Sequence, residues 1–241
     1  MVSELWPGGP LFKEEGDVFR VGADSMLLAD FAGKTLIKKK KRAIDLGCGS
    51  GVISVLLAWN DPGLHIDGVE LSAPAARLAR ENAALSGFAD RISIIEGDLR
   101  RHREMLQNGL YDLTVSNPPY NPHGKGKQPV NAERAAARDD AQCSISDLCK
   151  AAQFLTRWGG SFALVHRPEW LPEVFRTLSA SGFEPKRVRF VQHTQSSPPS
   201  LVMIESRRGG NPSLRVEAPL ILIGGDGRDT DEVREIYRIR V

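Results

Sequence analysis

From residue 43 onward the sequence alternates short apolar runs with segments of helical periodicity. This alternation is typical of βα units, in which successive strands are parallel and helices cover both faces of one sheet. Helices are expected at about 52–59, 74–86, 145–158 and 168–181. The expected strands are residues 43–47, 65–71, 92–99, 111–116, 161–167, 187–192 and 201–206. The sequence therefore predicts an α/β fold with a seven-stranded, doubly wound and mostly parallel sheet.

The last two expected strands are joined by HTQSSPPS, residues 193–200. This segment is too short and too rich in proline and serine to form a helix. We therefore expect the last two strands to form an antiparallel hairpin at the C-terminal end of the sheet. The chain has 241 residues, of which 41% are hydrophobic and 26% charged, so it can bury one substantial core. A single domain is expected over residues 1–241.

The three cysteines, Cys48, Cys143 and Cys149, lack the spacing of metal ligands, and we expect reduced thiols and no metal. The N-terminus does not resemble a signal peptide, and the sequence contains no apolar run of eighteen residues. A soluble, cytoplasmic protein is expected. The formal net charge is +2, but basic residues gather at 38–42, 100–103, 124–127 and 185–189, which weakly favours a polyanionic partner.

A glycine-rich loop, DLGCGSG, follows the first expected strand and precedes a helix. Glycine at positions 47, 49 and 51 permits a tight turn and close approach of the backbone to a ligand, and the helix N-terminus adds free N–H groups. The spacing differs from the GxGxxG that binds the pyrophosphate of a dinucleotide. A hydride-transfer enzyme therefore fits poorly.

Acidic residues stand at the ends of the next two expected strands. Glu70 follows the glycine loop by about twenty residues, where a carboxylate can accept hydrogen bonds from both hydroxyls of a ribose. Asp98 ends the third strand and is suited to an adenine amine. A capping or surface role explains either acid alone. Together with the glycine loop, the two acids predict a nucleoside-containing cofactor.

The fourth expected strand ends in SNPPY, residues 116–120, and a long polar stretch, 121–142, follows it. An exocyclic amine is a poor nucleophile, because its lone pair is delocalised, unless two fixed acceptors bind its N–H groups. The side chain of Asn117 and the backbone of Pro118 offer such oxygens, and Pro118 and Pro119 restrict the backbone. Tyr120 provides a face on which a flipped-out base can stack. The motif predicts a clamp for an amine.

These motifs together resemble the Rossmann-like S-adenosylmethionine-dependent methyltransferases that carry an NPPY clamp. The resemblance implies that Asp45, Gly47, Gly49 and Gly51 line the methionine side of the cofactor. It also implies that Glu70 holds the ribose and Asp98 the adenine, with S-adenosylhomocysteine as the product. The same clamp is similar to that of DNA adenine, ribosomal RNA guanine and release-factor glutamine methyltransferases. The last group carries a long helical domain before the glycine loop, whereas 44 residues precede Asp45 here.

Residues 16–31, GDVFRVGADSMLLADF, are similar to a segment of the bacterial tRNA(Val) (adenine-37) N6-methyltransferase family that packs over the cofactor. Residues 164–171, 184–191 and 201–206 also look like that family. By this resemblance 1–42 is a cofactor-covering segment, 43–208 the Rossmann-like core and 209–241 a tail. Arg20 and Asp24 become cofactor-binding residues. Arg138 matches an arginine of the family, although Asp139 and Asp140 replace its His-Glu pair. The residues that match in 16–31 are Phe19, Arg20, Gly22, Asp24, Ser25, Leu27, Leu28 and Phe31.

The resemblance implies N6-methylation of an adenine in tRNA, adenosine 37 beside the anticodon, with S-adenosylmethionine as methyl donor. The alternatives are methylation of a ribosomal RNA guanine, a DNA adenine or a protein glutamine, or an RNA-binding module without activity. A tRNA substrate needs contacts to phosphates around the site. Lys125, Lys127 and Arg138 follow the clamp, and we expect them to supply such contacts.

Overall fold

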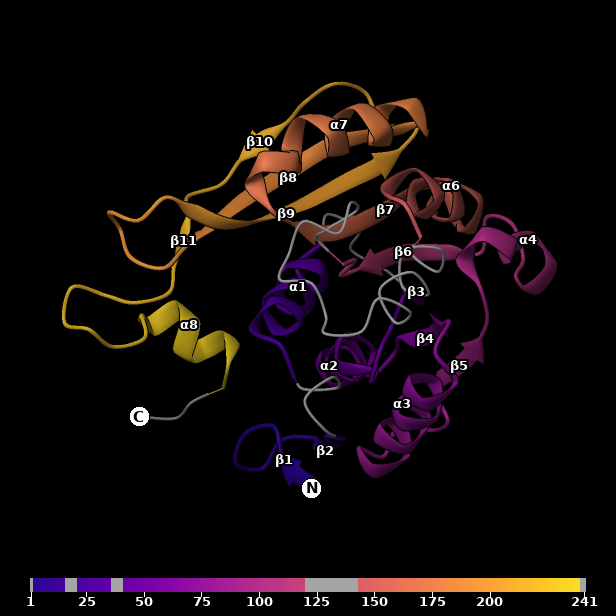
Figure 1. Cartoon of the computed structure of the whole chain (residues 1–241), viewed down its shortest axis with the longest axis horizontal. Helices are drawn as coiled ribbons and strands as arrows, with labels where there is room; N and C mark the ends of the chain where they lie inside the picture. Colours follow the sequence, from indigo (N-terminus) through magenta and orange to yellow (C-terminus); the bar gives the residue numbers. More distant parts are fainter. Residues whose placement is uncertain (1, 16–20, 36–40, 120–142, 239–241) are drawn as a thin grey trace, which may run out of the picture.

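The computed structural model describes residues 2–15, 21–35, 41–119 and 143–238 (Figure 1). The strands are β1 (Val2–Glu4), β2 (Leu11–Lys13), β3 (Arg42–Leu46), β4 (His65–Glu70), β5 (Ile92–Glu96), β6 (Tyr111–Ser116), β7 (Thr156–His166), β8 (Phe183–Gln192), β9 (Pro199–Arg208), β10 (Arg215–Val216) and β11 (Leu220–Ile221). The helices are α1 (Ala23–Gly33), α2 (Val52–Asn60), α3 (Ala73–Leu85), α4 (His102–Met105), α6 (Ile145–Leu155), α7 (Leu171–Ala180) and α8 (Asp231–Ile236). Two short 3₁₀ helices are η1 (Leu99–Arg101) and η2 (Pro168–Trp170).

The seven expected strands all lie in one large sheet. Its order is β10-β8-β9-β7-β6-β3-β4-β5, with β11 also paired to β8. All pairings among β3, β4, β5, β6 and β7 are parallel. Strand β9 lies between β7 and β8 and is antiparallel to both. The mostly parallel sheet with an antiparallel C-terminal hairpin is therefore confirmed. The tail adds β10 and β11 to this sheet.

Helices cover both faces of the sheet. Helices α1, α2 and α3 lie on one side, and α6 and α7 lie on the other (Figure 1). The first layer buries α1 and α2 side chains such as Leu28 and Val55, and the second buries α6 and α7 side chains such as Leu155 and Leu178. Both cores exclude water from apolar surface, which is the main favourable term in folding. Among the described residues, no helix is long and apolar enough to cross a membrane.

Two predicted helices have different bounds. The helix expected at 145–158 ends at Leu155, and Trp158 already belongs to β7, which pairs with β6 from Thr156 onward. Helical periodicity does not reveal this pairing with a distant strand. The helix expected at 168–181 is divided into η2 and α7. Prolines in the first turn of each segment fit this division, because a first-turn residue needs no N–H partner.

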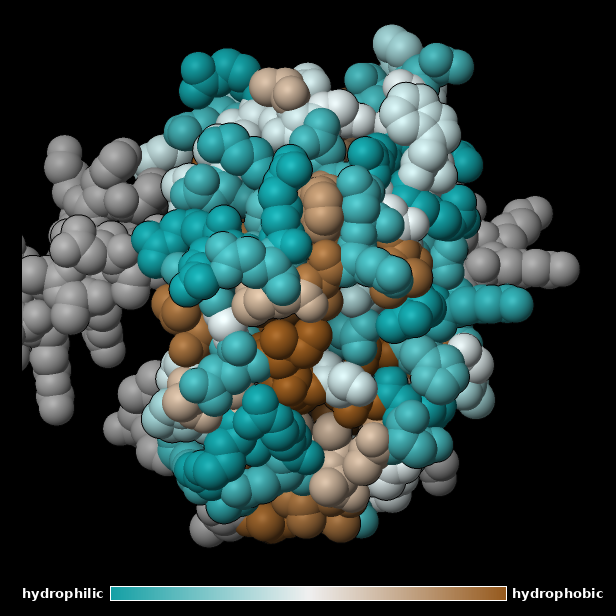
Figure 2. All heavy atoms as spheres, turned by 90° about the vertical axis from the view of Figure 1, so that its right-hand side faces the viewer, coloured by the Kyte–Doolittle hydropathy of each residue, from teal (hydrophilic) through white to brown (hydrophobic). Residues whose placement is uncertain are grey.

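Strand β5 forms the outer edge of the sheet, at the right of Figure 1. Figure 2 looks at that side of the molecule and shows apolar side chains gathered between hydrophilic ones. Within β5, Ile94 and Ile95 are half-buried. The guanidinium of Arg80 donates from Nε and one terminal nitrogen to the carbonyl oxygen of Ile94, at 3.2 and 3.1 Å. Arg80 belongs to α3, so this helix supplies a donor to a carbonyl of the edge strand, which discourages pairing with another chain.

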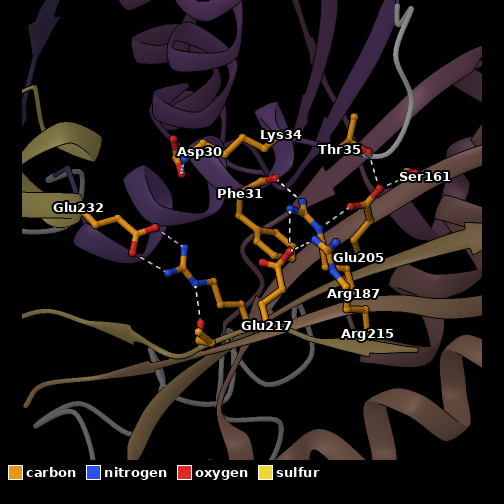
Figure 3. Close-up of polar contacts among 12 residues, drawn as sticks. Asp30, Phe31, Lys34, Thr35, Ser161, Arg187, Glu205, Arg215, Glu217 and Glu232 are labelled. Atoms are coloured by element: carbon orange, nitrogen blue, oxygen red, sulfur yellow. Dashed lines mark hydrogen bonds and ion pairs between the residues drawn. The ribbon is translucent and has the colours of Figure 1, made fainter. Parts of the chain in front are cut away.

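A buried ion pair joins the C-terminal half of the sheet to α1 (Figure 3). Arg187 on β8 donates from Nε to Glu205 Oε2 on β9 at 3.0 Å, and both side chains are almost fully buried. The same guanidinium donates to the carbonyl oxygen of Phe31 at 2.6 Å and lies 3.9 Å from the centre of its ring. Glu205 Oε1 also accepts from the hydroxyls of Thr35 and Ser161. The pair therefore fixes the C-terminal end of α1 against β8 and β9.

Candidate cofactor and amine-binding site

The site lies where the strand order reverses. Strand β3 has β4 on one side and β6 on the other, and ligands of open α/β sheets bind outside the carboxyl ends of strands at such a point. A cavity of about 230 Å³ opens there. It is lined by Leu46, Gly47, Val69, Glu70, Leu71, Gly97, Asp98, Leu99, Ser116, Asn117, Pro118, Pro119, Cys143 and Leu148. The structure thus brings one glycine of the loop, both acids and the start of the clamp together.

The glycine loop adopts left-handed backbone conformations at Gly47, Gly49 and Gly51, with φ of 74°, 54° and 85°. A Cβ atom built on Gly47 or Gly49 would meet no atom within 4 Å, so these two glycines border open space. A Cβ on Gly51 would lie 3.2 Å from Cβ of Ala79 on α3. Gly51 is therefore required for close packing of the loop against α3, and it does not line the cavity.

Asp45 lies beneath the loop and does not line the cavity. Its side chain is fully buried, and Oδ2 accepts a hydrogen bond from the hydroxyl of Ser54 at 2.8 Å. Within the described residues, Oδ1 has no hydrogen-bond partner. Burial raises the pKa of Asp45 to about 7. Burial without full hydrogen bonding disfavours the charged form of a carboxyl. A cation bound nearby would favour that form.

We expect the Asp45→Asn variant to gain stability relative to the wild-type protein as the pH rises from 5 to 8. The folded-state pKa of Asp45 is raised above its unfolded value, so the folded protein holds the proton more tightly and loses stability as the pH rises through this window. The loss between pH 5 and pH 8 is on the order of 2–3 kcal/mol, since part of the titration already occurs below pH 5. Urea unfolding at several pH values measures it. The variant Asp90→Asn, at an exposed position, is the control. Parallel curves for Asp45→Asn and wild type would contradict the assignment.

Glu70 and Asp98 line the cavity from the ends of neighbouring strands. Glu70 accepts from the backbone N–H of Gly49 at 2.9 Å and from that of Ser72 at 2.8 Å, one bond to each oxygen. A carboxylate has about four acceptor sites, so both oxygens can accept further bonds. Asp98 accepts from the backbone and the guanidinium of Arg100, which holds its pKa below the ordinary value. The carboxylates of Glu70 and Asp98 are therefore both held in place by hydrogen bonds at the cavity.

The amine clamp begins directly after β6. Ser116 donates its hydroxyl to the carbonyl oxygen of Leu46 at 2.7 Å, which ties the end of β6 to the end of β3. Asn117, Pro118 and Pro119 follow and line the cavity. The amide nitrogen of Asn117 donates to Oγ of Ser25 in the first turn of α1, at 3.1 Å. This contact turns the amide nitrogen toward α1.

Six further expected site residues remain: Asp24, which the structure describes, and five that it does not. Asp24 lies in the first turn of α1 and does not line it. Arg20, Tyr120, Lys125, Lys127 and Arg138 lie outside the described residues. The apolar lining was not predicted. It includes Leu71 and Leu99, which directly follow Glu70 and Asp98 in the sequence, and this adjacency is a signal that sequence reasoning could have used.

The side chains that line the cavity fit a cationic nucleoside. Its carboxylates accept hydrogen bonds from hydroxyl and amino groups, its apolar side chains can cover a base, and Gly47 and Gly49 leave room beside the backbone. The negative charge of Glu70 favours a ligand with a positive centre, whereas that of Asp98 is compensated by Arg100. In the described parts of the chain, no group of three or more metal-ligating side chains comes together.

The sheet order, the glycine loop and the cavity define a Rossmann-like S-adenosylmethionine-dependent methyltransferase. The model of the methyltransferase small domain family matches residues 20–168. A tRNA1(Val) (adenine(37)-N6)-methyltransferase from Dickeya chrysanthemi is 33% identical over 97% of this chain and 94% of its own. The chain therefore belongs to the methyltransferase small domain family and, within it, to the family of the tRNA1(Val) (adenine(37)-N6)-methyltransferases.

Solved structures share the fold at lower identity. A predicted O-methyltransferase from Agrobacterium tumefaciens has a TM-score of 0.72 and 20% identity, covering 89% of this chain and 95% of its own. A geranyl diphosphate C-methyltransferase from Streptomyces coelicolor, solved with S-adenosyl-L-homocysteine, has a TM-score of 0.55 and 13% identity over 76% of this chain and 78% of its own. These similarities concern the fold alone, and the fold class is the predicted one.

Proposed function

We propose that this chain transfers a methyl group from S-adenosylmethionine to N6 of an adenine in tRNA, at adenosine 37 beside the anticodon. The observation that carries the proposal is the position of Asn117 at the cavity, with its amide nitrogen held by Ser25. This orientation presents the amide oxygen as the acceptor for a substrate amine. The named activity of the relative that matches along almost the whole chain supports the choice of substrate.

In the proposed site Glu70 accepts from the ribose hydroxyls of the cofactor and Asp98 from its adenine amine. Gly47 and Gly49 leave space for the methionine part, and Asp45 lies buried next to the loop. When bound, S-adenosylmethionine supplies a methyl group on a sulfonium, and the electron pair of the broken S–C bond stays on sulfur. The residues of this chain determine where the acceptor amine is held relative to that methyl group.

Asn117 Oδ1 and the backbone oxygen of Pro118 accept the two N–H bonds of the adenine amine. These bonds draw the nitrogen toward tetrahedral geometry and make its lone pair available as the new N–C bond forms. The nitrogen then carries a positive charge and releases a proton to water, so the clamp needs no strong base. We propose Tyr120 as the surface on which the adenine stacks and Arg138 as a contact to the tRNA backbone.

The test incubates the purified protein with radiolabelled S-adenosylmethionine and separate pools of tRNA, ribosomal RNA, DNA and release factor. We expect label in the tRNA pool, and nuclease digestion should yield N6-methyladenosine from position 37. Label in another pool would replace the proposed substrate by that one. A protein that binds RNA but labels no pool would be a binding module instead.

We expect replacement of Lys125 and Lys127 by glutamine to weaken tRNA binding and to reduce its salt dependence. Each lost phosphate contact should lower the slope of log affinity against log salt by about one unit, with cofactor binding unchanged. The control is neutralisation of residues 38–41. Lys41 lies near the start of β6, where its N–H donates to Asp112, whereas the cavity lies at the other end of this strand. Filter binding across a salt series measures both variants. A larger effect of the control would contradict the proposed path of the tRNA.

A further inference from the structure

One residue of the N-terminal segment contacts the amine clamp directly. Ser25 lies in the first turn of α1, 92 residues before Asn117 in the sequence, and its Oγ accepts a hydrogen bond from Asn117 Nδ2 at 3.1 Å. The sequence motif around Ser25 gave cofactor-binding roles to Arg20 and Asp24 and gave none to Ser25. Its position beside the clamp therefore requires a separate explanation.

The chemistry of an asparagine amide explains what this contact does. The amide carries two N–H donors at one end and an acceptor oxygen at the other, and rotation about the last side-chain bond exchanges them. An adenine amine also presents N–H groups, so a rotated Asn117 would place donors against donors. An acceptor beside Nδ2 favours the productive orientation. A serine hydroxyl can accept there, because its oxygen has two lone pairs besides its one proton.

Helix α1 holds Ser25 firmly enough for this task. Leu27, Leu28 and Phe31 of the helix are almost fully buried in the core. At its C-terminal end the carbonyl oxygen of Phe31 accepts from Arg187 at 2.6 Å, as Figure 3 shows. A functional group on a packed helix is positioned more accurately than one on a loop. Ser25 is thus a rigid reference point next to a residue at the end of β6.

We infer that Ser25 is a positioning residue for methyl transfer, acting by fixing the orientation of the Asn117 amide. The inference deepens the proposed function and rests on the amine clamp within it, but it does not depend on which nucleic acid supplies the amine. It predicts that Ser25 affects the rate of the methyl transfer step and that this effect requires Asn117. It also predicts little effect on cofactor binding.

The test is a double-mutant cycle, measured on whichever acceptor pool takes up label from wild-type protein. We expect Ser25→Ala to lower kcat about tenfold, with the Kd for S-adenosylhomocysteine and the melting temperature almost unchanged. Ser25→Thr keeps a hydroxyl and should retain most of the wild-type kcat. In an Asn117→Ala background, the additional Ser25→Ala change should lower kcat less than twofold. The matched control is Ser179→Ala, an exposed helical serine on α7.

Two results would overturn the inference. One is a wild-type kcat for Ser25→Ala. The other is an equal loss from Ser25→Ala in the presence and absence of the Asn117 side chain, which would indicate a role independent of the amide. Failure of the proposed function has a different signature, because label would then enter a pool other than tRNA or no pool at all. For an inactive protein, a Ser25→Ala variant that lowers the melting temperature as much as a core substitution would assign Ser25 to stability and overturn the inference.

Discussion

Replacement of Asn117 by alanine is expected to slow methyl transfer by about two orders of magnitude or more while cofactor affinity stays nearly unchanged. The lost contact is a preorganised acceptor that matters most as charge develops on the attacking nitrogen, so its loss raises the transition state and leaves the ground state almost unaffected. Single-turnover reactions with labelled S-adenosylmethionine measure the rate, and calorimetry with S-adenosylhomocysteine measures the affinity.

The control is Asn108→Ala. Asn108 is exposed and precedes β6, whereas Asn117 follows the same strand, so the two substitutions have the same chemistry at opposite edges of the sheet. We expect wild-type rates for this variant. If Asn117→Ala lost cofactor affinity by the same factor as rate, Asn117 would be a cofactor-binding residue and the clamp would need another acceptor.

Replacement of Glu205 by alanine is expected to destabilise the protein by about 3 kcal/mol, because it leaves the buried guanidinium of Arg187 with only the more distant carboxylate of Glu217, at 3.6 Å. Glu205 is 1% exposed and Arg187 5% exposed, so water cannot replace the lost partner. The hydroxyls of Thr35 and Ser161 would also lose their acceptor. Denaturant unfolding of both proteins measures the difference.

Two further variants test whether the loss comes from the buried charge of Arg187, which would then have only Glu217 as its partner. The double replacement Arg187→Met with Glu205→Leu removes both charges and should recover much of the stability, since apolar residues often replace a buried ion pair at little cost. Glu184→Ala, at a half-buried position near the start of β8, should change stability by less than 1 kcal/mol. An equally small effect of Glu205→Ala would show that the pair is not part of the stable core.

The convergence of the site could be predicted from sequence because parallel strands carry it. Gly47, Asp98 and Asn117 follow strands and Glu70 ends one, and the carboxyl ends of parallel strands meet on one side of the sheet. Which residues of the motif line the cavity and which are buried behind it could not be predicted in this way. Asp45 and Gly51 belong to the same motif as Gly47, yet the packing of α2 and α3 places them below the cavity.

Contacts between distant segments could not be predicted either. No local pattern relates Ser25 to Asn117, although a serine within an otherwise apolar helical face could have drawn attention. Glu205 stands within an apolar strand sequence, LVMIES, which indicates a buried partner without identifying Arg187. The short elements β1, β2, β10, β11 and α8 escaped prediction because they are too short to show a periodic pattern and depend on pairing or packing with other elements.

The position of β9 also bears on how the chain assembles during synthesis. Strands β7 and β8 are made before β9, yet β9 lies between them, so neither can complete its pairing until residues 199–208 leave the ribosome. Until then each of the two strands has an open edge that could pair with another chain. Glu205 belongs to β9, so the ion pair with Arg187, which holds the C-terminal end of α1, is also completed late. The cofactor half of the sheet can therefore form in the order of synthesis, whereas the support of α1, the helix that carries Ser25, depends on one of the last strands to emerge.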